Sequence, residues 1–147
     1  MFESTRLLYA ELAKALGVDS LPADDNGSLQ LNIGDSSSVV MFAEDDTTLM
    51  LLSAVMPLPR KLDYGRTLWL LRRGFHDSPI APFRVSCDKA GTLVVWGRLP
   101  VADMTGEVLA GLLDALGGEA DLIRDELTLD DSPDAEDAGE GASKPAG

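Results

Sequence analysis

The chain has 147 residues, which favours a single domain with its own hydrophobic core. It carries 25 acidic and 12 basic side chains, and this net charge of −13 argues against nucleic acid or an anionic membrane as the main partner. The single cysteine, Cys87, excludes an intrachain disulfide, and with only one histidine, His76, a structural zinc site is not expected.

The N-terminal residues do not resemble a targeting or membrane-spanning segment. No apolar run approaches the length that a bilayer requires, and the opening MFESTRLLYAELAKALG lacks the order of a secretory signal. We therefore expect a cytoplasmic protein.

The first elements in chain order are a helix and three strands. Residues 4–16 repeat apolar side chains at helical spacing and are followed by Gly17, a residue typical of helix ends. Residues 28–34 alternate apolar and polar side chains, as a strand with one buried face does. Residues 37–44 and 47–55 are two more strand-like segments, and the short acidic connection between them predicts a hairpin.

A second helix, two strands and a last helix follow. Residues 60–75 have helical spacing, and residues 82–88 and 91–99 are strand-like segments joined by a tight turn. Residues 105–127 contain two consecutive glycines, yet the apolar stripe keeps its phase across them, which predicts one continuous helix.

This order, α-βββ-α-ββ-α, predicts an α+β fold in which helices pack mainly on one face of a twisted antiparallel sheet. Residues 1–127 would form that domain. Residues 128–147 have no apolar pattern and carry six acidic side chains against one lysine, so we expect a disordered acidic tail.

No catalytic, metal-binding or cofactor-binding pattern stands out. The chain has no phosphate-binding glycine motif. Cys87 and His76 are the only candidates for a nucleophile and its base, but Cys87 alternates with Phe83 and Val85, so we expect it to be a small buried hydrophobe. We expect neither a cofactor nor catalysis.

The stretch TLMLLSAVMPLPR, residues 47–59, is apolar at consecutive positions, which a strand with one wet face would not be. One of its two apolar sets must share the second face of the sheet with Val94 and Trp96. An apolar patch with a polar rim on that face indicates an interaction site. A dimer partner or a helix of the same chain would explain it equally well. The candidate partner-binding residues are Val94, Trp96, Met50, Leu52, Val40 and Phe42.

Residues 68–116 resemble a known family. They contain a leucine-rich helix end (68–71), Asp88 with Gly91 and Leu93 at a turn between strands, and a Leu-Pro pair (99–100) before an amphipathic helix. These features are similar to those of the class I type III secretion chaperones, the Tir-chaperone (CesT-like) family of Gram-negative bacteria, over about residues 2–127. Arg73-Gly74 departs from the family, which often has a small residue and asparagine there.

The resemblance implies a bacterial cytoplasmic homodimer that performs no catalysis. Such a protein holds the N-terminal segment of a secreted effector in a non-globular form that remains competent for export. Apolar patches and strand addition at a sheet edge commonly hold the effector in this family. The second helix and a neighbouring strand commonly build the dimer contact, which here implies Leu68, Trp69, Arg72, Phe75 and Phe83.

Two other functions remain open from the residues alone. One is a regulator of the same fold that sequesters a partner that is not secreted. The other is a small-ligand or enzyme domain, which would need converging polar groups that the sequence does not indicate.

Overall fold

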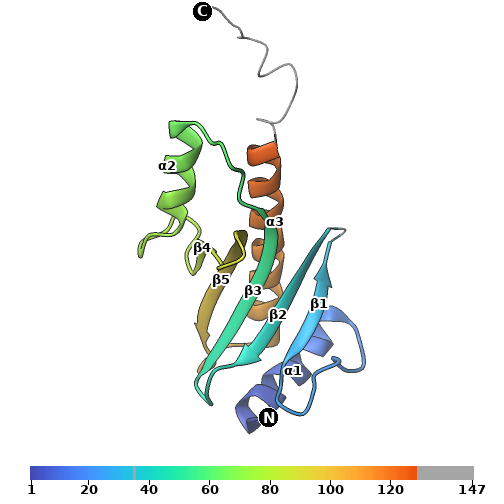
Figure 1. Cartoon of the computed structure of the whole chain (residues 1–147). Coiled ribbons are helices and arrows are strands. Elements are labelled where there is room, and N and C mark those ends of the chain that lie inside the picture. The colour runs from blue at the N-terminus through green and yellow to red at the C-terminus, as the bar shows by residue number, and fades with distance from the viewer. Residues whose placement is uncertain (35, 129–147) are drawn as a thin grey trace, which may run out of the picture.

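The protein is an α+β domain, described here from a computed structural model of residues 1–34 and 36–128 (Figure 1). The elements, in order, are α1 (Glu3–Leu16), β1 (Leu29–Ile33), β2 (Ser37–Ala43), β3 (Thr48–Pro57), α2 (Tyr64–Arg73), β4 (Phe83–Cys87), β5 (Thr92–Pro100) and α3 (Gly106–Thr128). The order and the fold class predicted from the sequence are confirmed. The expected acidic tail lies outside the described residues, apart from Thr128 at the end of α3.

One antiparallel sheet organises the domain, with the strand order β1-β2-β3-β5-β4. Helices α1 and α3 pack on one face of this sheet, and Figure 1 shows the other face with no helix over it. We call the first the helix face and the second the open face.

The core lies between α3, α1 and the helix face. Leu109, Leu116 and Ile123 recur at helical spacing along α3 and are fully buried against the sheet, where Leu51 and Val95 are also fully buried. Burial of large aliphatic side chains of this kind is the main favourable contribution to folding.

Helix α3 runs without a break through its two glycines. Gly117 faces β1, where a Cβ atom would lie 2.8 Å from Cγ2 of Ile33, so the absent side chain lets helix and strand approach. Near the C-terminal end of α3, Arg124 donates from Nε to the carbonyl of Val55 at 3.0 Å and from Nη1 to Oγ of Ser37 at 3.0 Å. These bonds fasten the helix to β3 and β2.

Helix α2 is shorter than predicted and lies apart, beyond β4 at the edge of the sheet (Figure 1). It begins after Asp63, whose side chain accepts a hydrogen bond from the backbone N–H of Arg66 at 2.7 Å and so caps the helix. Residues 58–63 are an irregular connection rather than its first turn. Arg73 links α2 to α3 through an ion pair with Glu119, with 2.7 Å between Nε and Oε2.

Candidate functional site

The six candidate partner-binding residues lie together on the open face. Val40, Leu52 and Trp96 are register partners across β2, β3 and β5, and Phe42 and Met50 form the neighbouring pair of β2 and β3. Val94 lies on the same face of β5, two residues before Trp96. We call Val40, Phe42, Met50, Leu52, Val94 and Trp96 the open-face patch.

The register settles which apolar set of β3 turns outward. Leu49 and Leu51 are buried on the helix face, so Met50 and Leu52 belong to the open face. The apolar run 49–52 is therefore two interleaved sets, one used by the core and one on the open face. On that open face Leu52 is half-buried, whereas Met50 is only 9% exposed.

Polar side chains border the open-face patch. Trp96 donates from its indole nitrogen to Oγ of Ser86 at 2.9 Å, which fixes the ring on the sheet. Arg98 donates from Nε and Nη2 to the two carboxylate oxygens of Glu44 at 2.8 and 2.9 Å. The hydrogen bonds and the charge of Glu44 raise the pKa of Arg98 above its usual value. An apolar centre inside a polar border is the usual layout of a protein-binding surface.

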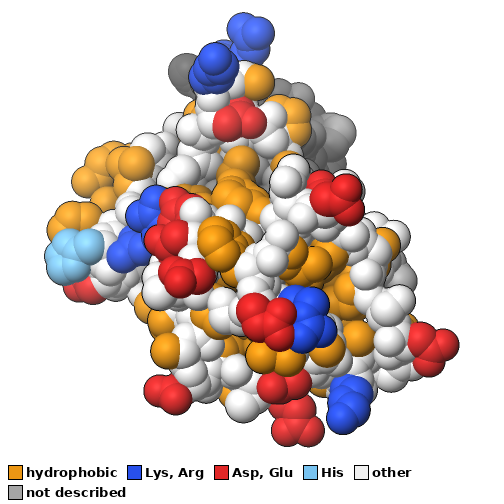
Figure 2. Space-filling view, turned by 90° about the horizontal axis from the view of Figure 1, so that it is seen from below, with side chains coloured by type: hydrophobic (Ala, Val, Ile, Leu, Met, Phe, Trp, Pro, Cys, Tyr) orange, Lys and Arg blue, Asp and Glu red, His pale blue; other side chains and the backbone are white. Residues whose placement is uncertain are grey.

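A second apolar surface lies around α2. Tyr64, Leu68, Leu71 and Phe75 are exposed, with exposed fractions of 68% for Leu71 and 58% for Phe75. Figure 2 shows hydrophobic side chains gathered at one side of the molecule beside the single histidine, His76.

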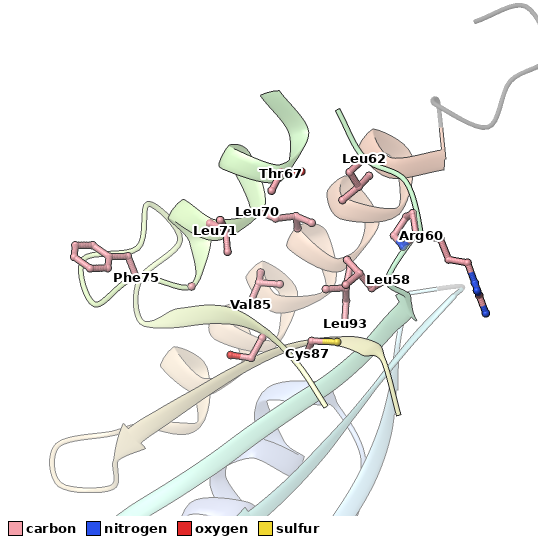
Figure 3. A pocket seen from close by; sticks show the side chains of 13 residues that line it. Leu58, Arg60, Leu62, Thr67, Leu70, Leu71, Phe75, Val85, Cys87 and Leu93 are labelled. Carbon is pink, nitrogen blue, oxygen red and sulfur yellow. The ribbon is translucent and has the colours of Figure 1, made fainter. Parts of the chain in front are cut away.

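A groove of about 710 Å³ separates α2 from the sheet (Figure 3). Leu70 and Leu71 from α2 line one wall, and Val85 and Leu93 from β4 and β5 form another. Leu58 and Leu62, from the irregular connection, also line this α2 groove. Sequence reasoning missed both, because it took Leu58 as part of a strand end and Leu62 as part of a helix that begins at residue 60. Pro57, Pro59 and the capping residue Asp63 are the signals that could have located the helix start correctly.

The residues expected at a dimer contact divide between exposed and buried positions. Leu68, Arg72 and Phe75 are exposed on or just after α2. Trp69 is half-buried, and the guanidinium carbon of Arg73 lies 3.7 Å from the centre of its ring. Phe83 is only 2% exposed and belongs to the core, so it is not at the surface of the single chain.

Cys87 is exposed, and the expectation that it is buried was wrong. It does share the helix face of β4 with Val85, but it stands at the end of an edge strand, beside the α2 groove, where no helix covers it. His76 is exposed too, in the turn after α2.

The two edges of the sheet differ in access. β1 pairs only with β2, and its outer edge is open. At the β4 edge the chain beyond α2 folds back, because Arg84 donates to the carbonyl of Phe75 at 3.2 Å and to that of His76 at 2.8 Å. An added strand would therefore find β1 the more accessible edge.

Neither a metal-binding cluster nor a membrane-spanning helix is found in the described part of the chain. In residues 1–34 and 36–128, no three His, Cys, Asp or Glu side chains are grouped so that they could hold a metal ion. None of the helices in that part of the chain combines the length and hydrophobicity that a bilayer crossing requires.

Comparison with known proteins identifies the family. Residues 7–124 match the model of the Tir chaperone protein (CesT) family. No curated protein sequence shows significant similarity to the chain.

Solved structures of similar fold include several complexes of two proteins. The complex of the Yersinia pestis type III secretion chaperone SycH with a stable fragment of YscM2 has a TM-score of 0.70 and 22% identity, covering 81% of this chain and 98% of that one. The ExoU–SpcU complex of the Pseudomonas aeruginosa type III secretion system has a TM-score of 0.64 and 26% identity, covering 80% and 95%. The Pseudomonas aeruginosa ExoT–SpcS complex has a TM-score of 0.63 and 15% identity, covering 83% and 98%.

Proposed function

Because this chain belongs to the Tir chaperone protein (CesT) family, we propose that it is a type III secretion chaperone that binds the N-terminal segment of a secreted effector. By holding that segment non-globular, it keeps the effector competent for export. It acts in the bacterial cytoplasm and catalyses no reaction.

The single observation that carries this proposal is the open-face patch. Six apolar side chains from β2, β3 and β5 are contiguous on a face that no helix of the described chain covers. Covering them with another chain removes apolar area from water, at about 25 cal/mol per Å². A net charge of −13 opposes aggregation of the chain through the empty patch, because like charges repel.

The open edge of β1 supports binding of an extended segment rather than of a folded domain. An unpaired edge offers main-chain N–H and C=O groups to an added strand, and the pockets beside it select alternate side chains. A segment paired with β1 would remain extended for as long as it is bound.

We also propose that two copies of the chain associate through α2. The exposed side chains of Leu68, Leu71, Arg72 and Phe75, together with the adjacent α2 groove, support this contact. Phe83 is buried in the single chain, so we do not include it in the proposed contact with a second copy.

The test is co-purification of the full chain with N-terminal fragments of exported proteins from the same genome, co-expressed one at a time. We expect Trp96→Asp to abolish capture, because a charge would be buried at the centre of the patch. Leu16→Asp, which adds the same charge at an exposed position at the end of α1, away from the sheet edge and the patch, is the matched control and should keep capture.

Thermal unfolding of each variant shows whether the fold is retained. The captured fragment should be cleaved by protease like an unfolded chain. Capture that survives both Trp96→Asp and Leu52→Asp would show that the open face is not the binding site. Selective capture of a protein that is not exported would instead favour the regulatory function.

A further inference from the structure

A third apolar surface lies at the end of the molecule where α1 meets the β2–β3 turn. It is a trough of about 390 Å³, separate from both surfaces described above. We call it the α1 trough, and it is lined by Ser4, Leu7, Leu8, Glu11, Asp46, Thr47, Val101, Ala102 and Met104.

Three segments that are distant in sequence are fastened together to form the trough. Ser4 donates from Oγ to the carbonyl of Asp46 at 2.9 Å, and the N–H of Val101 donates to the carbonyl of Thr47 at 2.9 Å. Glu11 on α1 accepts a bond from the N–H of Gly106 at 3.0 Å. The walls are therefore held in place before anything binds.

The apolar part of the trough is incompletely covered. Leu7 is 51% exposed on the side of α1 away from the core stripe, and Val101 and Met104 are half-buried. An aliphatic side chain from another molecule would contact all three and would displace water from them.

The charged side chains of the trough are all acidic. Glu11 and Asp46 line it, and no lysine or arginine does. Neither of the two forms an ion pair with any described residue. Figure 2 views this end of the molecule and shows hydrophobic side chains with carboxylates around them. Residues 1–59 as a whole carry nine acidic and two basic side chains.

We propose that the α1 trough binds a cationic, amphipathic part of the partner protein: an aliphatic side chain flanked by lysine or arginine. The inference rests on the proposed function, because it assigns a second contact to the same bound chain. The aliphatic anchor fills the floor, and the flanking cations lie near Glu11 and Asp46, where opposite charges attract and like-charged segments are rejected.

The test uses isothermal titration calorimetry on the full chain at low salt, with a synthetic 12-residue peptide of leucines flanked by lysines. Two matched peptides replace the lysines by glutamates or the leucines by serines. We expect only the lysine–leucine peptide to bind, and we expect its affinity to fall as salt is added.

Two charge reversals of equal size locate the site. Asp46→Lys should lower the affinity for the peptide by about tenfold or more, because it places a cation beside the lysines of the peptide. Asp125→Lys, on an exposed position of α3, changes the net charge equally and should leave affinity within about twofold. Leu7→Gln, at an exposed site, is a second variant that should also weaken binding.

If Asp46→Lys and Asp125→Lys lowered the affinity for the peptide equally, the proposal would be overturned. Equal losses of affinity would indicate a general attraction of the cationic peptide to an acidic protein. Binding of the glutamate peptide would overturn it as well. The outcome is separable from that of the proposed function. Trp96→Asp should abolish capture of exported fragments but leave the affinity for the peptide unchanged. Capture tests the open-face patch and peptide affinity tests the α1 trough, so each can fail without the other.

Discussion

Gly117 on α3 and Ile33 on β1 are so close that a Cβ atom on the glycine would lie 2.8 Å from Cγ2 of the isoleucine. Its neighbour Gly118 has nothing within 4 Å of the same position. We expect Gly117→Ala to lower the free energy of unfolding, because helix and strand must separate. Gly118→Ala should raise it by about 1 kcal/mol, since alanine favours the helix. Urea unfolding measures both, and equal effects of the two changes would contradict this packing.

The position of α2 should depend on the ion pair between Arg73 and Glu119. Their side chains are only 14% and 10% exposed, and Arg73 also lies over Trp69. Glu119→Gln should cost about 1–3 kcal/mol, because it leaves a largely buried guanidinium without its counter-charge. In the Glu119→Gln protein, the rate of amide hydrogen exchange in α2 should rise, while the rate in the core strands should change little.

The control for this prediction is Glu3→Gln. Glu3 pairs with Arg6 on the exposed side of α1, and such surface pairs contribute little. The free energy of unfolding of the Glu3→Gln protein should stay close to that of the original protein. If Glu119→Gln were equally neutral, the ion pair would not be what holds α2.

The proposed self-association predicts a change of oligomeric state. Leu71→Asp should convert a dimer to a monomer in light scattering, because Leu71 is the most exposed leucine of α2. Leu16→Asp is the matched control, since Leu16 is 44% exposed at the end of a different helix, α1. A monomeric wild-type chain, or a Leu71→Asp variant that remains dimeric, would contradict the α2 contact.

The thiol of Cys87 offers an independent measure of the same association. Cys87 is exposed beside the α2 groove in the single chain. If a second copy covers this groove, a thiol reagent should react slowly with the wild-type protein and faster with Leu71→Asp. Equal rates in the two proteins would indicate that the groove stays open.

Tyr9 should make stability depend on pH in the alkaline range. Burial, and to a lesser extent the charge of Asp24, raises its pKa to about 12. Its hydroxyl donates to the carbonyl of Gly27 at 2.8 Å. In the unfolded chain the pKa is about 10.

A pKa raised by folding means that the neutral tyrosine is favoured in the native state. The contribution of Tyr9 to the free energy of unfolding is therefore complete below about pH 10 and is lost as the pH rises towards 12. Urea unfolding at several pH values should show this decline, and Tyr9→Phe should show less of it. An identical decline in both proteins would mean that other groups are responsible.

Much of the fold could be predicted because local sequence patterns reflect burial. The alternation of residues 28–34 and the unbroken stripe of α3 each report on one neighbouring surface, and both predictions were confirmed. The predicted start of α2 was wrong by several residues, because the connection that precedes it has apolar side chains used by the α2 groove.

The sequence by itself determined the order of the elements, the family resemblance, and the presence of more apolar side chains than one face of a sheet can bury. Only the tertiary structure decided that Met50 and Leu52 turn to the open face, that Cys87 is exposed at an edge, and that Leu7 meets Val101 across the α1 trough. The reason is physical. Periodicity shows which side chains of one helix or strand share a face. Which surface covers that face depends on contacts between residues far apart in the chain.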